Sequence, residues 1–148
     1  MTDERIGGQA FAAGAIGLIA GGVFHSLAVL GALLGEPTNE ADAAYRNAAK
    51  AFELLPPPLG TTMWDAAQIL SASYSVLIIQ VGVLNLVVMR AMHAQGQLAR
   101  LTWLNVVFVT LLLAIGAAVL FPPPIIFAGF SLACFAFSLR QQIRATAE

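Results

Sequence analysis

Three long stretches of the sequence carry no charged residue: positions 6–35, 66–89 and 101–139. A helix that crosses the hydrocarbon core of a bilayer needs about 20 mainly apolar residues, and each stretch is at least that long. Lipid offers no hydrogen bonds to the backbone, so such segments must cross as helices that satisfy their own amide groups. The sequence therefore predicts an all-α, polytopic membrane protein.

The composition supports the same conclusion. Hydrophobic residues make up 59% of the 148 residues and charged residues only 10%, whereas a soluble domain averages about 25% charged residues. Too few polar side chains remain to cover a soluble surface, so membrane lipids are the expected surroundings. The net charge of −1 leaves no basic surface for nucleic acid. A single cysteine excludes an intramolecular disulfide.

The third uncharged stretch is too long for one helix and contains three consecutive prolines at 122–124. Proline disrupts a helix interior but fits the first turn of a new helix. We therefore predict four transmembrane helices in an up-down bundle, which form a single domain over residues 1–148. The expected ranges are 10–34, 63–89, 101–121 and 123–141.

The longest loop, residues 35–62, contains a short amphipathic pattern of its own. Apolar side chains recur at helical spacing, Asn39 can cap the start, and Asp42 and Arg46 stand four residues apart. We expect a helix over 39–55 that lies on the membrane surface, outside the cytoplasm.

Basic residues are distributed unequally between the two sides that four spans would create. Five of the seven fall on the side that holds both termini, namely Arg5, Arg90, Arg100, Arg140 and Arg144. The positive-inside rule then places both termini in the cytoplasm. The alanine- and glycine-rich composition is typical of a high-GC bacterium, which implies the inner membrane.

Small residues recur on one face of the first span, at Gly14, Gly17 and Gly21. Such spacing permits close helix contact, and packing within the chain or between copies is the simplest interpretation. Gly82 and Gly116 are the corresponding packing candidates in the second and third spans.

His25 continues the glycine face and is therefore expected to point toward protein. Its depth corresponds to polar positions of the second span, and Cys134 of the fourth span is expected near that level. A structural hydrogen bond that fixes helix register is one interpretation, and a ligand or proton site is the other. Asp65 either caps the second span with Thr62 or lines the mouth of this site. The candidate ligand-binding residues are thus His25, Gln68, Ser71, Ser75, Asp65 and Cys134.

Missing residues exclude several classes of membrane protein. No carboxylate lies within a span, which argues against ion-coupled transporters. His25 and Cys134 are too few ligands for a metal, and no Ser-His-Asp or Cys-His-Asp set is available. No cofactor is expected. The size and helix count resemble those of small four-helix glutathione- and eicosanoid-type enzymes, but Asn85 and Arg90 lack the glutamate that accompanies them there.

Three functions remain open. The favoured one is a non-enzymatic bundle that packs as an oligomer or as an accessory subunit and holds a lipid or quinone-like molecule near His25. The second is an enzyme on a lipophilic substrate, with His25 as acid–base and Asp65, Tyr74 or Gln68 assisting. The third is a channel or transport protomer lined by polar residues of the second span, namely Gln68, Ser71, Ser75 and Asn85.

Overall fold

The computed structural model describes residues 2–119 and 122–145, in which every regular element is a helix. Four helices are long and apolar enough to cross a membrane. The prediction of an all-α bundle with four spans and a short amphipathic helix is confirmed. The helices are α1 (Thr2–Leu34), α2 (Glu40–Ala51), α3 (Met63–Ala94), α4 (Leu98–Val119) and α5 (Pro122–Ala145).

Helix boundaries differ from the expected ranges at several ends. α1 begins at Thr2 rather than at residue 10, because the polar residues before the span continue the helix beyond the apolar segment. α2 ends at Ala51 rather than at residue 55: the Phe52 amide closes the last turn on the Ala48 carbonyl, and the chain then turns into an isolated bridge between Glu53 and Thr62. The expected end of the third span, 120–121, lies outside the described residues.

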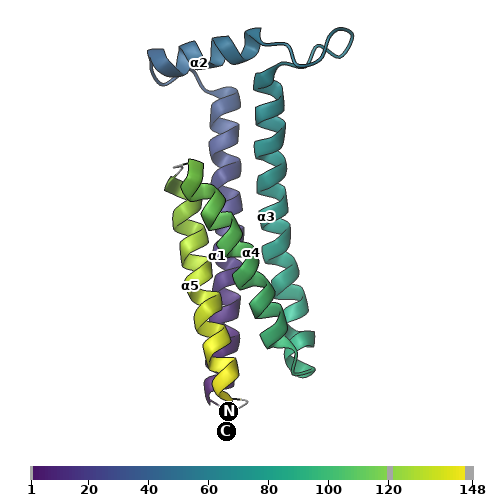
Figure 1. The fold of residues 1–148 in the computed structure, drawn as a ribbon, viewed down its shortest axis with the longest axis vertical. Helices are drawn as coiled ribbons and strands as arrows, with labels where there is room; N and C mark the ends of the chain where they lie inside the picture. Colours follow the sequence, from purple (N-terminus) through teal and green to yellow (C-terminus); the bar gives the residue numbers. More distant parts are fainter. Residues whose placement is uncertain (1, 120–121, 146–148) are drawn as a thin grey trace.

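Helix α2 lies across the ends of α1 and α3 (Figure 1), and contacts of Arg46 hold it there. Its guanidinium donates to the Ala32 and Gly35 carbonyls at 3.0 and 2.9 Å, which caps the end of α1, and it pairs with Asp42 at 3.0 Å. That pairing holds the pKa of the Asp42 carboxyl below its ordinary value. Arg46 also lies over the ring of Trp64, the second residue of α3. α2 is therefore anchored to both α1 and α3.

Helix α1 lies at the centre of the bundle. It packs along α3 on one side and along α5 on the other, while α4 packs mainly on α5 and has little contact with α3. Figure 1 shows α4 crossing the bundle obliquely, from the turn after α3 to the start of α5. The packing order α3–α1–α5–α4 differs from the chain order because α4 leans away from α3.

Glycines set both contacts of α1. A β-carbon at Gly14 or Gly21 would lie 2.9 Å from the side chain of Phe135 or Phe127 on α5. On the other side, a β-carbon at Gly82 of α3 would lie 2.7 Å from the Ala15 carbonyl oxygen of α1. Both interfaces therefore depend on missing side chains, as small-residue contacts between membrane helices do.

Other glycines differ in their packing. Gly17 lies against Ser131 of α5, where a β-carbon would come within 2.6 Å of the hydroxyl oxygen. Gly22, which lies outside the predicted small-residue face, packs on α3 against Ile79. At Gly116, an added β-carbon would lie 3.4 Å from the Ile125 side chain, which is an ordinary van der Waals distance.

The spans have unequal lengths. α1 has 33 residues and α4 has 22, so they measure about 50 and about 33 Å. Only the shorter one matches the hydrocarbon core of about 30 Å. Gly21 packs on Phe127, and counting back along α5 from Phe127 places its start near the level of His25. The α4–α5 hairpin therefore ends below α2, as Figure 1 shows.

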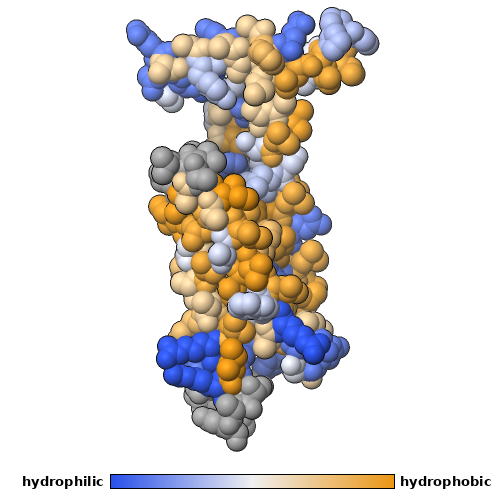
Figure 2. All heavy atoms as spheres, viewed as in Figure 1, coloured by the Kyte–Doolittle hydropathy of each residue, from blue (hydrophilic) through white to orange (hydrophobic). Residues whose placement is uncertain are grey.

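Charged residues mark the opposite end of the bundle. Both termini lie there (Figure 1), and hydrophilic residues gather at both ends of the visible face, with hydrophobic residues between them (Figure 2). Arg140 lies 18 residues after the start of α5, a rise of about 27 Å. Arg140 and the start of α5 are thus separated by about one hydrocarbon thickness.

Buried polar side chains connect the helices near the arginine-rich end. Asn85 of α3 and Asn105 of α4 donate to each other at 2.6 and 3.0 Å. The Gln142 amide of α5 donates to the Thr102 hydroxyl of α4 at 3.1 Å and to the Ser138 hydroxyl at 2.7 Å. The Ser138 hydroxyl in turn donates to the Gly7 carbonyl of α1 at 2.7 Å. These bonds connect all four spans near that end of the bundle.

Candidate functional site

A groove opens where α4 leans away from α3, beside the upper half of α1. Its volume is about 40 Å³, room for roughly three waters or a short part of one lipid chain. The described lining is almost wholly apolar. It comprises Leu18, Gly21, Phe24, His25 and Ala28 of α1, Tyr74 and Ile78 of α3, Leu112 of α4, and Phe127 and Ala128 of α5.

His25 and Tyr74 bring hydrogen-bonding groups to this groove. Their rings meet edge to face, with centroids 5.4 Å apart and planes at 85°. Both lie near the level at which α5 begins, while Leu18 lies seven residues, about 10 Å, deeper. The polar side chains therefore lie in the half of the groove nearer to α2, and the half around Leu18 is apolar.

Polar candidates on α3 lie beside the groove or beyond it. Ser75 is buried, but its hydroxyl donates to the Ser71 carbonyl one turn away at 3.1 Å. Gln68 precedes Tyr74 by six residues, about 9 Å nearer to α2. None of these three candidates is among the residues that line the groove. The structure brings Tyr74 to His25 at the level where Gln68, Ser71 and Ser75 were expected.

Asp65 belongs to the start of α3. Its carboxylate accepts from the Thr62 backbone amide at 3.0 Å and from the Thr62 hydroxyl at 2.7 Å, and its own amide donates to that hydroxyl. This is the capping box that the sequence pattern predicts. One carboxylate oxygen, Oδ2, accepts both of these bonds, and Asp65 stands nine residues before Tyr74.

The expected depth of Cys134 was wrong. Its neighbour Phe135 packs against Gly14, eleven residues below His25, so Cys134 lies about three turns deeper than the histidine. The reason is the short α4–α5 hairpin, which begins near the level of His25. Residues in the middle of α5 therefore meet the lower half of α1.

The α4 and α5 contributions to the groove, Leu112, Phe127 and Ala128, were not predicted. On α1 the groove residues recur every three or four positions, which is the same pattern that identified the glycine face. No comparable signal identifies the residues of α4 and α5, because their levels depend on how far the hairpin reaches.

The groove offers hydrogen bonds and apolar contact but no formal charge. Among its described lining residues there is no carboxylate, lysine or arginine. Within residues 2–119 and 122–145, no group of three His, Cys, Asp or Glu side chains is placed to hold a metal ion. An uncharged polar group, such as a carbonyl, can accept a hydrogen bond from an imidazole N–H or a phenol O–H.

Comparisons of the chain with known protein families, with curated proteins and with solved structures find no match.

Proposed function

We propose that the protein is a binding protein rather than an enzyme, and that it holds one lipid or quinone-like molecule in the groove beside His25. The supporting observation is the pair His25–Tyr74 in the half of an otherwise apolar groove that is nearer to α2. A membrane amphiphile oriented like its neighbours would place its polar part at this pair and its chain along Leu18 and Ile78. The small volume suits part of one chain or the edge of a ring.

Acid–base catalysis receives less support from the same geometry. The Asp65 carboxylate, which the enzyme hypothesis paired with His25, serves the cap of α3. General acid–base catalysis requires a donor or acceptor within about 3 Å of the reacting group or one water away. A binding role needs only the two ring side chains and the apolar walls.

The binding proposal predicts selective loss of a retained ligand. His25→Leu and Tyr74→Phe should each reduce the fraction of protein that carries a bound amphiphile by about two- to tenfold, the equivalent of one hydrogen bond. Native mass spectrometry of the protein extracted in mild detergent measures this fraction directly.

Matched controls exist because the chain has two histidines and two tyrosines. His93→Leu and Tyr45→Phe lie outside the groove and should retain the ligand as the parent does. Equal retention by His25→Leu, Tyr74→Phe and both controls would contradict the proposal. Thermal unfolding of each variant separates loss of ligand from loss of fold.

The proposal includes assembly with a second copy or a larger membrane partner. α1 continues toward α2 for about two turns beyond the level at which α5 begins. The leucines of this part are exposed: Leu27 is 62% and Leu34 is 79% exposed. Lipid chains cover only the part of this surface that lies below the boundary. The mass measured for the intact complex in the same experiment gives the number of copies.

We further propose that the arginine-rich end with both termini faces the cytoplasm, because five of seven basic residues lie there. Cysteine introduced at Asn47 should react with a membrane-impermeant thiol reagent in intact cells, whereas cysteine at Gln97 should react only after the cells are opened. The reverse labelling pattern would overturn this orientation.

A further inference from the structure

A second groove runs between α4 and α5 at the arginine-rich end of the bundle. Its volume is about 480 Å³. Trp103 and Val106 line it from α4, and the residues from α5 include Ala136, Leu139, Arg140 and Arg144. This groove lies at the other end of the spans from His25 and shares no residue with the first groove.

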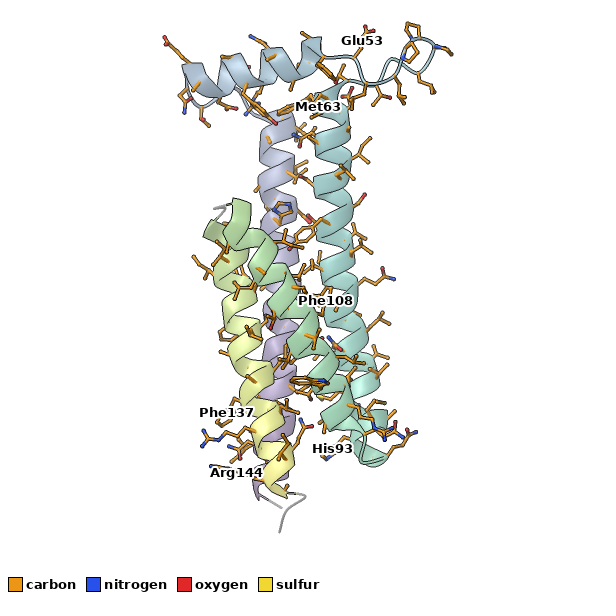
Figure 3. The ribbon with its side chains drawn as sticks, viewed as in Figure 1. Glu53, Met63, His93, Phe108, Phe137 and Arg144 are labelled. Atoms are coloured by element: carbon orange, nitrogen blue, oxygen red, sulfur yellow. The ribbon has the colours of Figure 1, made fainter. Side chains whose placement is uncertain are left out.

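The two arginines stand four residues apart on α5, so they share one face of the helix, with about 6 Å between their β-carbons. Both are exposed, as is Trp103. Figure 3 labels Arg144 near the lower end of α5, and Figure 2 shows hydrophilic residues at that end of the visible face. Among the described side chains, the one ion pair joins Asp42 and Arg46 at the opposite end, so neither arginine pairs with a described carboxylate.

The depth of the groove matches the orientation of a lipid. Arg140 lies about one hydrocarbon thickness from the start of α5, which puts it at the membrane boundary, and Arg144 lies one turn farther out, at head-group level. Ala136 lies one turn deeper, beside the apolar wall of Val106 and Leu139. Positive charge and apolar surface therefore follow each other along the groove as phosphate and acyl chain do along a phospholipid.

We propose that this groove binds an anionic phospholipid of the adjacent leaflet, with its phosphate between Arg140 and Arg144 and an acyl chain along Ala136 and Leu139. Guanidinium groups donate several hydrogen bonds in a planar arrangement that matches phosphate oxygens. Two positive charges, neither of them paired with a carboxylate among the described side chains, favour a lipid with net negative charge over a zwitterionic one. Trp103 has the amphipathic ring that suits contact with the glycerol and ester region.

The proposal is tested with the full-length protein in detergent micelles that contain equal amounts of phosphatidylglycerol and phosphatidylcholine. Native mass spectrometry counts each bound lipid. The parent should retain more phosphatidylglycerol, and Arg140→Gln and Arg144→Gln should each lower its preference by about fivefold. Ala136→Phe should lower retention of both lipids, because the new ring fills the apolar part of the groove at an exposed position while both arginines remain.

Two charge-matched controls locate the effect. Arg90 lines a third groove at the same end of the bundle, together with Arg5 and His93, and Arg90→Gln removes one charge from that groove. Arg100→Gln removes one charge at the same end from a residue that lines neither this third groove nor the groove of Arg140 and Arg144. Both should keep the preference of the parent, and glycerol 3-phosphate should not displace the lipid.

Several results would overturn the proposal: equal retention of the two lipids by the parent, full preference in the Arg140→Gln/Arg144→Gln double variant, unchanged retention by Ala136→Phe, or displacement by glycerol 3-phosphate. Loss of the preference in Arg90→Gln alone would assign the lipid to the other groove. His25→Leu should leave the preference unchanged, so this test is independent of the site beside His25.

Discussion

Gly82→Ala should destabilise the protein by about 1–3 kcal/mol, although the substitution adds only one methyl group. That methyl group would lie 2.7 Å from the Ala15 carbonyl oxygen and 2.6 Å from the Ile19 side chain. A side chain can rotate away, but the carbonyl is part of the α1 backbone. Relief therefore requires α1 and α3 to separate, which would loosen their packing around this contact.

A control substitution makes the sign of this effect informative. Gly129 is also within a span helix, but no atom lies within 4 Å of the position of its β-carbon. Alanine favours a helix over glycine by about 1 kcal/mol, so Gly129→Ala should unfold at the same temperature as the parent or higher. Thermal unfolding in one detergent compares the two variants. If Gly82→Ala were as stable as Gly129→Ala, the close contact between α1 and α3 would be wrong.

Asn105→Leu should be the most damaging single change among the buried polar residues. It leaves the Asn85 amide, which is 4% exposed, without the partner to which it donates at 2.6 Å. A buried polar group that loses its partner costs about 1–3 kcal/mol. Asn85→Leu should cost less, because Asn105 would still donate to the Leu101 carbonyl at 2.9 Å.

The double variant Asn85→Leu/Asn105→Leu provides the decisive comparison. Removing both amides leaves neither unpaired, so the pair should unfold closer to the parent than Asn105→Leu does. The unfolding free energies of the four proteins complete the cycle. Additive losses in the double variant would show that the two amides do not interact across α3 and α4.

The charge-free stretches determined the class of the protein and the number of its spans. Their effect is local: a long apolar segment has no stable alternative to a helix in lipid, and three adjacent prolines permit only a new helix start. The caps of α2 and α3 were predictable for the same reason, since Asn39 and the Thr62–Asp65 box act within one turn. The periodicity of small residues likewise indicated which face of α1 carries His25.

The tertiary structure alone decided which residues meet that face. The level of α5 depends on the reach of the α4–α5 hairpin, and the opening of the groove depends on the lean of α4 away from α3. Neither is encoded in a local pattern, because both follow from close contacts between helices far apart in the chain, such as Gly21 with Phe127 and Gly82 with Ala15. A shift of one helical turn in either contact would place a different set of side chains beside His25. This is why Tyr74 was one option among several in the sequence, whereas Leu112 and Phe127 had no signal at all.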